Sequence, residues 1–219
     1  MEYNDRFKDA PWYEKSSNEH IILVGTGGIG SNALFALTKT VPATYWIYDP
    51  DKVEAINIGT QNFKKNQIGK YKVSSILQNC QEQSNCSIRQ FNSKYNNEYF
   101  PIMITGLDNM ATRKQVFEKW SKQDNRELLI DGRLRANLYE VYVVTKGREE
   151  QYEATLFDDS EVDDGPCTFK QTAYFGMLIG ARITHVLVNY LINKYANEEI
   201  CNLPFKISEF GEPFLIEVL

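Results

Sequence analysis

The stretch Ile21-Ile-Leu-Val-Gly-Thr-Gly-Gly-Ile-Gly30 decides the fold of this chain. Four apolar residues, typical of a buried strand, run directly into a glycine-rich turn, and the amphipathic segment 31–40 follows at once. A strand, a turn and a helix start in this order are typical of a phosphate-binding unit, because the helix N-terminus attracts an anion. The pattern Gly25-x-Gly27-x-x-Gly30 therefore predicts a nucleotide site, and a glycine turn without a ligand is the alternative.

Asp49 narrows the choice of ligand. It ends the apolar run 44–48, about 20 residues beyond the glycines, where a carboxylate that binds the ribose of a nucleotide is expected. Gly25 permits the tight turn, Gly27 lets the backbone approach a phosphate, and Gly30 lets helix and strand pack closely. Up to this point, a nicotinamide-dependent dehydrogenase explains the sequence.

Polar residues beyond the second apolar run fit such a dehydrogenase less well. The set consists of Asn57, Gln61, Lys72, Asp108 and Asn109. A dehydrogenase binds an uncharged nicotinamide beyond the pyrophosphate and has no clear use for these side chains. An enzyme that cleaves ATP needs a cation for the triphosphate, a carboxylate for Mg²⁺ and amides that orient the attacked phosphate. The sequence therefore favours ATP with Mg²⁺ over NAD.

The combination of segments resembles the superfamily of adenylyltransferases that activate ubiquitin-like and sulfur-carrier proteins, which includes ubiquitin-activating enzymes and the ThiF, MoeB and HesA proteins. The resemblance covers most of the chain, and it implies a single adenylation domain of the ThiF type over residues 1–219. The matching blocks are, in order, Gly25-Thr-Gly-Gly-Ile-Gly30, Asp49-Pro-Asp-Lys-Val53 with Asn57 and Gln61, Gly69-Lys-Tyr-Lys-Val73, Asp108-Asn109 with Arg113, and Asp131-Gly-Arg133 before Glu140-Val-Tyr-Val-Val144. Each block alone is weak, and their order and spacing together make the match strong.

The resemblance implies a role for each matching side chain. Asp49 would hold the ribose hydroxyls, Lys72 would neutralise charge on the triphosphate, and Asp108 would bind Mg²⁺ directly or through water. Asn57 would lie near the phosphates, and Asn109 would help to shape the adenine side. The other residues that the resemblance assigns to the nucleotide are Gly25, Gly27, Gly28, Gly30 and Gln61. Taken singly, Asp49 could instead be a turn residue, Lys72 a solvated helix lysine, and Asp108-Asn109 a helix N-cap pair.

Thr60 departs from the family pattern. Family members commonly have Asn-x-x-Arg-Gln in the second block, where the arginine contacts phosphate, whereas this chain has Asn57-Ile-Gly-Thr-Gln61. A threonine cannot neutralise charge as a guanidinium does. Either another arginine substitutes, or the enzyme is slow, or the chain has lost the reaction. Arg133 and Arg135 are nearest in the expected fold, and Arg6 corresponds loosely to an N-terminal arginine of the family, although each could be a solvated surface residue.

Cys167 follows the acidic segment Phe157-Asp-Asp-Ser-Glu-Val-Asp-Asp-Gly-Pro166, which we expect to be a mobile crossover loop near residues 157–170. In some relatives a cysteine of this region takes the carrier protein as a thioester, and in others it takes part in sulfur transfer. The alternative is a structural cysteine, since cysteine is often buried and nearby carboxylates oppose a thiolate. The four cysteines form no Cys-x-x-Cys pair, so we expect no structural zinc, which many relatives carry.

Apolar runs alternate with amphipathic segments over the first half of the chain. Strands are expected near 21–24, 44–49, 87–92, 101–105 and 127–131, and helices near 29–40, 68–81 and 110–122. The second half adds an alternating strand over 137–144, a helix over about 171–194, and a hairpin over 205–218 that turns at Gly211-Glu212. The sequence therefore predicts an α/β fold that is Rossmann-like, with a mainly parallel sheet, helices on both faces and antiparallel C-terminal strands.

Composition and charge set further bounds. The length of 219 residues and the 42% hydrophobic content fit one domain with a core, and the net charge of −5 without a basic stripe argues against nucleic acid. Residues 1–17 are too polar for a signal peptide, so we expect a cytoplasmic protein. The apolar stretch 173–192 contains Arg182 and His185, which predicts a buried helix and no membrane span. His185 is expected in the core or at an interface.

These observations predict an ATP- and Mg²⁺-dependent adenylyltransferase. Its substrate would be the C-terminal carboxylate of a small ubiquitin-like or sulfur-carrier protein, which it would convert to an acyl-adenylate. Lys72, Asp108 and Cys167 would be the catalytic residues, and the long apolar helix would contribute to a homodimer. Two alternatives stay open: a catalytically silent relative that binds a nucleotide or a carrier protein, which Thr60 favours, and an NAD-dependent oxidoreductase.

Overall fold

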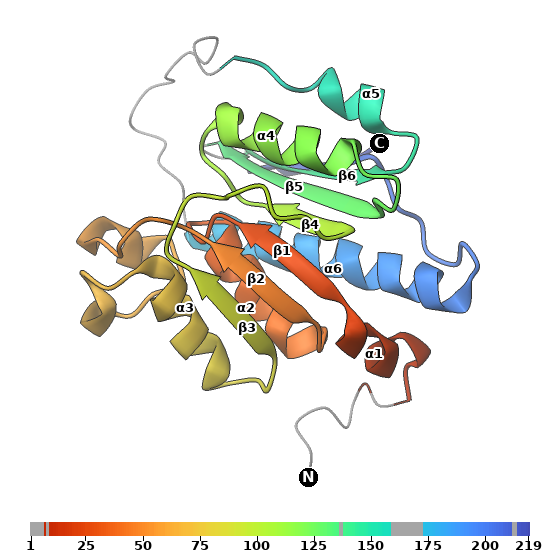
Figure 1. Cartoon of the computed structure of the whole chain (residues 1–219). Coiled ribbons are helices and arrows are strands. Elements are labelled where there is room, and N and C mark those ends of the chain that lie inside the picture. Colours follow the sequence, from red (N-terminus) through yellow and green to blue (C-terminus); the bar gives the residue numbers. More distant parts are fainter. Residues whose placement is uncertain (1–6, 8, 136–137, 159–172, 212–213) are drawn as a thin grey trace.

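An eight-stranded sheet organises the chain, in the order β3-β2-β1-β4-β5-β6-β7-β8 (Figure 1). This computed structural model describes residues 7, 9–135, 138–158, 173–211 and 214–219. Strands β1 to β5 run parallel, and β6 to β8 continue the sheet with antiparallel pairing. The strands are β1 (His20–Val24), β2 (Thr44–Tyr48), β3 (Ser87–Phe91), β4 (Ile102–Thr105), β5 (Leu128–Arg135), β6 (Leu138–Thr145), β7 (Lys206–Gly211) and β8 (Phe214–Val218).

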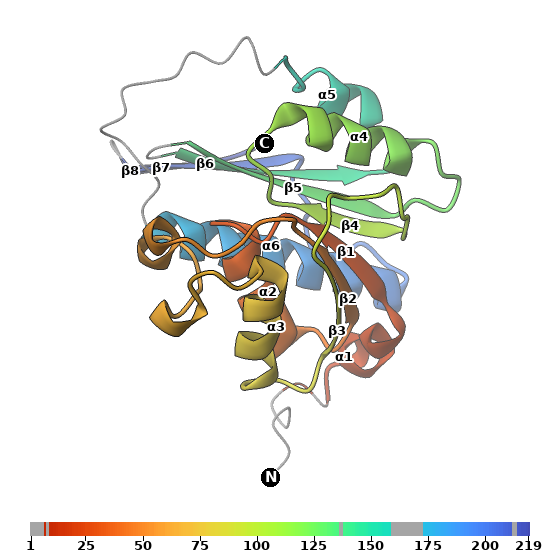
Figure 2. The same cartoon turned by 60° about the vertical axis from the view of Figure 1, so that its left-hand side comes forward.

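Helices cover both faces of the sheet, as the views in Figures 1 and 2 show. On one face lie α1 (Pro11–Lys15), α2 (Gly30–Thr40), α3 (Lys72–Gln81) and α6 (Ala173–Ala196). On the other face lie α4 (Met110–Ser121) and α5 (Glu149–Glu153). Within the described ranges, three short 3-10 segments connect these elements: η1 (Ser16–Asn18), η2 (Ala55–Gly59) and η3 (Lys65–Gln67).

The order of strands reverses around β1. This strand pairs with β2 on one side, where Leu23 lies opposite Ile47, and with β4 on the other, where Leu23 lies opposite Ile104. Right-handed crossovers then place α2 and α4, which follow β1 and β4, on opposite faces of the sheet. A reversal of this kind separates the two connections and opens a crevice at the carboxyl ends of the strands, where ligands bind in such sheets.

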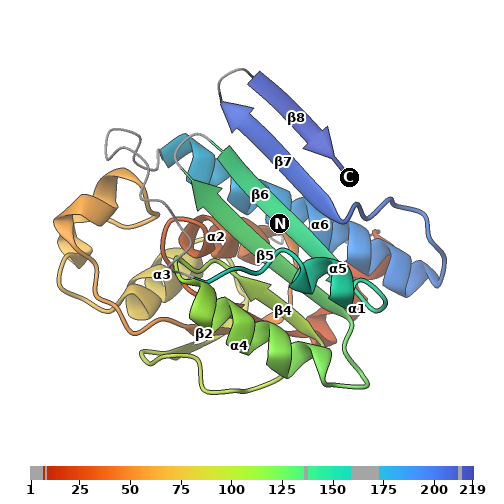
Figure 3. The ribbon, with the colours of Figure 1, turned by 90° about the horizontal axis from the view of Figure 1, so that it is seen from above.

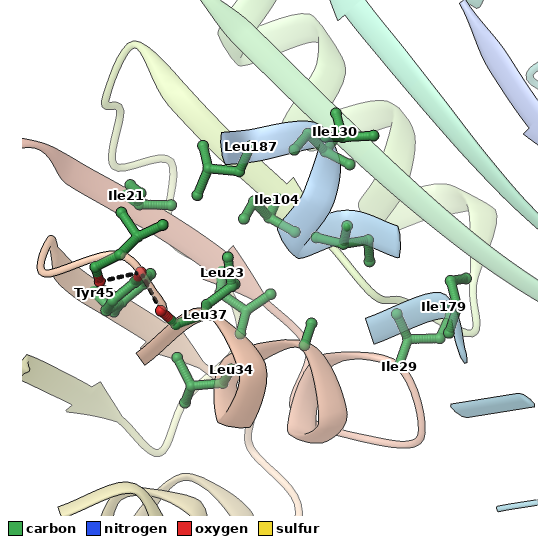
Figure 4. Packing of buried hydrophobic residues seen from close by; sticks show 14 of the residues in the cluster. Ile21, Leu23, Ile29, Leu34, Leu37, Tyr45, Ile104, Ile130, Ile179 and Leu187 are labelled. Carbon is green, nitrogen blue, oxygen red and sulfur yellow. Dashed lines mark hydrogen bonds between the residues drawn. The ribbon is translucent and has the colours of Figure 1, made fainter. Parts of the chain in front are cut away.

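The larger core lies between the sheet and α2 with α6 (Figure 4). Ile21 and Leu23, two residues apart on β1, share one face and are fully buried there. Tyr45 of β2 is also buried, and its hydroxyl donates to the carbonyl oxygens of Leu37 at 3.3 Å and Val41 at 2.9 Å. Both carbonyls lie at the C-terminal end of α2, and that of Leu37 also accepts the backbone N–H of Val41 at 2.8 Å, so the Tyr45 hydroxyl anchors the end of the helix to the core.

Two glycines let α6 lie directly against α2. A Cβ atom on Gly176 would lie 2.9 Å from both Nδ2 of Asn32 and the carbonyl oxygen of Gly28, and one on Gly180 would lie 2.7 Å from the backbone nitrogen of Ala33. The length and composition of α6 alone would suit a membrane span, but 50% of its most apolar window is buried inside the fold. The helix therefore packs behind the glycine-rich turn and supports it.

The predicted α/β fold with a mainly parallel sheet is confirmed, and the C-terminal hairpin forms the edge of the sheet seen from above in Figure 3. The helix expected over 68–81 begins only at Lys72, because Gly69 has a φ of +87° and the chain turns there. Helices α1 and α5 and the 3-10 segments were not expected, since elements of five residues or fewer show no helical period. The predicted crossover loop lies outside the described residues except for Phe157 and Asp158, and so does the start of the helix expected from residue 171.

Candidate functional site

The glycine-rich turn connects β1 to α2 and is closed on its inner side. Gly25 has a φ of +88°, which favours glycine, and a Cβ atom there would lie 2.6 Å from the carbonyl oxygen of Gly106. A Cβ atom on Gly30 would lie only 1.8 Å from the carbonyl oxygen of Gly25, so Gly30 has no room for a side chain. In contrast, a Cβ atom on Gly27 would meet nothing within 4 Å. The turn is therefore open at Gly27, where a ligand can approach the backbone.

Asp49 ties this turn to the end of β2. One oxygen of its carboxylate accepts hydrogen bonds from the backbone N–H of Thr26 at 2.7 Å and from the Thr26 hydroxyl at 3.0 Å. The other oxygen accepts the backbone N–H of Asp51 at 2.9 Å. A carboxylate has about four acceptor positions, so Asp49 can still accept from a ligand hydroxyl. It thus shapes the turn and also faces the cavity that the turn borders.

Lys72 is the first residue of α3 and reaches back toward the second strand. Its Nζ lies 2.9 Å from an oxygen of Asp51, whose side chain is 61% exposed, whereas that of Lys72 is 11% exposed. The backbone N–H of Lys72 also donates to the carbonyl oxygen of Asp51 at 2.9 Å. The ammonium group therefore stands at the cavity with one solvent-accessible partner, which a more strongly charged ligand can replace.

Asp108 and Asn109 lie between β4 and α4. Asn109 is the N-cap of α4, because its Oδ1 accepts the backbone N–H of Thr112 at 2.9 Å. Its Nδ2 lies 3.2 Å from an oxygen of Asp108. Asp108 itself is exposed. Both residues also line the cavity. Asn109 therefore caps α4 and borders the candidate site at the same time.

A cavity of about 570 Å³ brings these groups together at the carboxyl ends of β1, β2 and β4. Its volume falls within the roughly 300–1,000 Å³ of small-molecule sites. The predicted site residues that line it are Gly25, Gly27, Gly28, Asp49, Gln61, Lys72, Asp108 and Asn109. It lies at the reversal of strand order, where the fold places a ligand.

Of the residues Gln61, Asn57, Thr60 and Gly30, only Gln61 lines the cavity. Gln61 lines the cavity, and its Oε1 is buried without a hydrogen-bond partner, which is unusual for a buried polar atom. Asn57 is outside the cavity lining; its Oδ1 accepts the backbone N–H of Glu54 at 2.8 Å and caps η2. Thr60 also lies outside the lining, and its carbonyl oxygen is 3.4 Å from the position of a Cβ atom on Gly176. Gly30 supports the turn from behind.

Arg133 and Arg135, two of the three arginines considered as substitutes for the missing one, do not line the cavity. Nε of Arg133 lies 2.7 Å from an oxygen of Asp131, and its two terminal nitrogens donate to the carbonyl and the hydroxyl of Thr155, each at 2.9 Å. Arg135 is exposed, with its guanidinium 5.3 Å from the ring centre of Phe157. Because Asp131 and Thr155 already occupy the guanidinium of Arg133, this residue does not fit the role of the missing phosphate-binding arginine. Arg6 and Cys167 lie outside the described residues.

Asp131 holds the buried charge next to the cavity. Burial disfavours its ionised form, but the guanidiniums of Arg113 and Arg133 and the hydroxyl of Thr105 outweigh that effect, and the pKa of the Asp131 carboxyl is lowered. In return, its negative charge raises the pKa of Arg133 although burial alone would lower it. Asp131 thus forms two buried ion pairs, one with Arg113 and one with Arg133, next to the carboxyl end of β4.

The cavity also contains residues that were not predicted from the sequence. They are Val24, Ile29, Tyr48, Pro50, Asp51, Lys94, Tyr95, Gly106, Leu107, Ala111, Thr112 and Leu134. Tyr48 and Tyr95 are buried with their rings at 89° to each other and 5.8 Å apart, and Lys94 adds a second cation. Tyr48 ends β2, and Lys94 follows β3. The carboxyl ends of parallel strands meet at one edge of the sheet, so a search at the end of each strand could have found both residues.

His185 and three of the four cysteines lie within the described residues. His185 lies on the exposed side of α6, 3.3 Å from Nδ2 of Asn189, so of its two expected places the core is excluded and an interface stays a prediction. Burial raises the pKa of the Cys80 thiol to about 11, and burial also raises the pKa of Cys86. Cys201 is half-buried and free. Within the described ranges, no three His, Cys, Asp or Glu side chains gather as a metal-binding group.

The family model described as the ThiF family matches residues 4–212. The SUMO-activating enzyme subunit uba-2 of Caenorhabditis elegans is 28% identical over 170 residues, which cover 73% of this chain and 29% of that protein. The chain thus spans less than a third of the length of this curated relative.

Solved structures agree on the fold. E. coli MccB with ATP has a TM-score of 0.73 at 15% identity, covering 95% of this chain and 65% of that one. E. coli MccB with MccA has a TM-score of 0.75 at 16% identity, covering 100% of this chain and 72% of that one. PaaA has a TM-score of 0.73 at 15% identity, covering 95% of this chain and 66% of that one. At such identities these likenesses show the common fold.

Proposed function

This chain belongs to the ThiF family, and from that premise we propose that it is an adenylyltransferase, which uses ATP to activate a carboxylate. One observation carries the proposal: a single cavity holds the open glycine turn, the carboxylates of Asp49 and Asp108, and the ammonium group of Lys72. A sugar, a chain of phosphates and a metal ion need carboxylates and a cation, in addition to the backbone N–H donors of the turn. The solved structure of MccB with ATP, which has the same fold, supports the choice of nucleotide.

The free groups of the cavity fit a triphosphate. The turn is open at Gly27, beside the start of α2, where the helix dipole and free N–H groups favour an anion. The ammonium of Lys72 would exchange its exposed partner, Asp51, for phosphate oxygens. The buried and unpaired Oε1 of Gln61 would accept a hydrogen bond from the ligand or from a bound water.

The donor set also fits Mg²⁺. Proteins usually bind this ion through one or two carboxylates together with substrate phosphates and water, and they rarely provide a complete cage. Asp108, which is exposed at the cavity, would hold the ion directly or through water. Bound there, the ion would neutralise charge on the phosphates.

The reaction needs little acid–base chemistry from the chain. A carboxylate is already ionised at neutral pH, so one of its oxygens forms a bond to the α-phosphorus of ATP as the bond to the bridging oxygen breaks. Pyrophosphate leaves with the electron pair, and an acyl-adenylate remains. The residues of the cavity contribute position and charge neutralisation, with Lys72 facing the oxygens that gain charge.

The acceptor in this proposal is the C-terminal carboxylate of a small ubiquitin-like or sulfur-carrier protein in the cytoplasm. The name of uba-2 as a SUMO-activating enzyme subunit supports this class, and the structures of MccB with MccA support a polypeptide substrate more generally. ATP–pyrophosphate exchange with a small protein that ends in Gly-Gly tests the activity. Binding of ATP without exchange for any such protein would instead favour the silent relative, which Thr60 supports.

Two finer parts of the proposal concern thiol capture and assembly. Cys167 would take the activated carrier as a thioester, so Cys167→Ser should keep pyrophosphate exchange and lose an adduct that reductant removes; an adduct that persists would exclude this role.

A homodimer would bury the apolar side chains of Tyr174, Met177 and Leu178, which α6 exposes to solvent. Analytical ultracentrifugation of the wild type and of Met177→Glu tests it, and a monomeric wild type at micromolar concentration would contradict it.

A further inference from the structure

The carboxylate of Asp131 is the centre of a buried network that borders the cavity. Asp131 is fully buried on β5 and accepts hydrogen bonds from four side chains. One oxygen accepts from Oγ1 of Thr105 at 2.5 Å and from Nε of Arg113 at 2.7 Å. The other accepts from Nε of Arg133 at 2.7 Å and from the hydroxyl of Tyr152 at 3.0 Å. The network joins β4, α4, β5 and α5, and no lone pair is left unused.

The two arginines of this network differ in what else they hold. Arg113 uses a terminal nitrogen, Nη2, to donate to the carbonyl oxygen of Leu107 at 2.8 Å. Leu107 directly precedes Asp108, and both line the cavity. Arg133 turns its terminal nitrogens the other way, toward Thr155. Of the two arginines, only Arg113 therefore connects the buried carboxylate to the turn that presents Asp108.

Other hydrogen bonds also hold that turn, and one of them joins Nδ2 of Asn109 to a carboxylate oxygen of Asp108 at 3.2 Å. The backbone N–H of Gly106 donates to the carbonyl oxygen of Val24 at 2.9 Å, and the N-cap bond from Thr112 to Asn109 begins α4. Between these two bonds, the contact from Arg113 to Leu107 fixes the carbonyl next to Asp108. A guanidinium suits this task, because its planar fork can hold Asp131 and a carbonyl at the same time.

We propose that Arg113, anchored by Asp131, is a positioning residue that holds the turn 106–108 so that the carboxylate of Asp108 faces the bound nucleotide. The inference rests on the proposed use of the cavity for ATP. The simpler possibility is that Arg113 only neutralises Asp131. A lysine at position 113 separates these two possibilities, because it keeps a positive charge beside Asp131 but lacks the planar fork that also reaches Leu107. Only the positioning role is lost in that variant.

Hydrogen exchange tests the positioning directly and needs no nucleotide. In Arg113→Lys, the amides of Gly106 and Thr112, which bracket the turn, should exchange roughly tenfold faster, as expected for loss of a hydrogen bond from a charged group. Amides in the centre of β1 should not change. Arg133→Lys is the matched control, because it alters the same carboxylate by the same substitution without touching Leu107. Unchanged exchange of Gly106 and Thr112 in Arg113→Lys would overturn the proposal.

ATP binding in excess MgCl₂ then tests whether the positioning acts through Asp108. We expect Arg113→Lys to weaken the affinity roughly tenfold, and Asp108→Ala to weaken it at least as much. In the double variant the loss should equal that of Asp108→Ala alone, since a misplaced and an absent carboxylate are equivalent. Effects that multiply, or an Asp108→Ala variant that binds like the wild type, would overturn the proposal. A wild type that does not bind ATP would contradict the proposed function instead, and the exchange measurement would still decide the role of Arg113.

Discussion

The ammonium nitrogen of Lys72 lies 2.9 Å from a carboxylate oxygen of Asp51, and both side chains line the same cavity. Lys72 is the first residue of α3, where the positive end of the helix dipole disfavours a cation. Its side chain is nevertheless largely buried against one exposed partner. A lysine in this position contributes little to the helix itself, and the proposed function gives it an anionic ligand in the cavity.

Lys72→Ala should therefore abolish most of the activity while the protein stays folded. Removal of a preorganised charge partner typically lowers a rate by roughly 100- to 1,000-fold. Pyrophosphate exchange measures the effect, with thermal unfolding as a check of the fold. Lys70→Ala is the matched control, because Lys70 is exposed two residues earlier and does not line the cavity. Wild-type exchange in Lys72→Ala would remove this residue from the site.

Gly176→Ala should disturb the glycine turn from behind. The added methyl group would lie 2.9 Å from the side-chain amide of Asn32 and 2.9 Å from the carbonyl oxygen of Gly28. Overpacking of this kind typically destabilises a protein by about 1–3 kcal/mol, and here the displaced carbonyl belongs to the cavity wall. Urea unfolding and ATP titration should both show a loss. Gly59→Ala, which would meet nothing within 4 Å, should show neither, and an unaffected Gly176→Ala would mean that α6 does not support the turn.

Thr60→Arg should raise pyrophosphate exchange. Within the described part of the chain the cavity is lined by two lysines, Lys72 and Lys94, and by no arginine, and Arg133 is held by Asp131 and Thr155. A guanidinium at position 60 would add the charge that family members commonly have there. Exchange that stays at the wild-type rate would show that phosphate neutralisation in this chain does not depend on position 60.

Acid should weaken the fold partly through Asp131. Its pKa is lower in the folded chain than the value of about 3.9 expected in the unfolded chain. The ionised carboxylate therefore stabilises the fold fully above that value, and the contribution is lost as the pH falls through the folded pKa. Asp131→Asn should destabilise the protein by about 3–5 kcal/mol at pH 7, because two buried guanidiniums lose their partner. Urea unfolding of both proteins should show this difference shrinking below about pH 4, and a constant difference would refute the assignment.

The sequence was sufficient for the fold because the decisive signals are local. The run from Ile21 to Gly30 specifies a strand, a turn and a helix start by itself, and the conformation of Gly25 follows from that turn. Residues that end or follow a parallel strand, such as Asp49 and Asp108, could be placed at the cavity because strand ends meet at one edge of the sheet.

Other parts of the site depend on contacts that no local pattern shows. Arg133 was considered as a phosphate-binding residue, but its guanidinium binds Asp131 on the same strand and Thr155, which lies after β6 in the sequence. Asn57 fits the family spacing, yet its side chain caps η2. Lys94 follows the end of β3 and could have been found there, whereas the place of Tyr95 depends on the packing of its ring against Tyr48, a contact between segments far apart in the sequence.

Calorimetric titration with ATP and with NAD, each in the presence of MgCl₂, tests the central claim most directly. Both ligands contain adenine, ribose and a pyrophosphate, so the glycine turn and Asp49 could serve either. A triphosphate should also engage Lys72 and the carboxylate of Asp108. We predict that ATP binds, that Mg²⁺ strengthens its binding, and that NAD gives no useful affinity. Tight binding of NAD with no response to ATP would contradict the account.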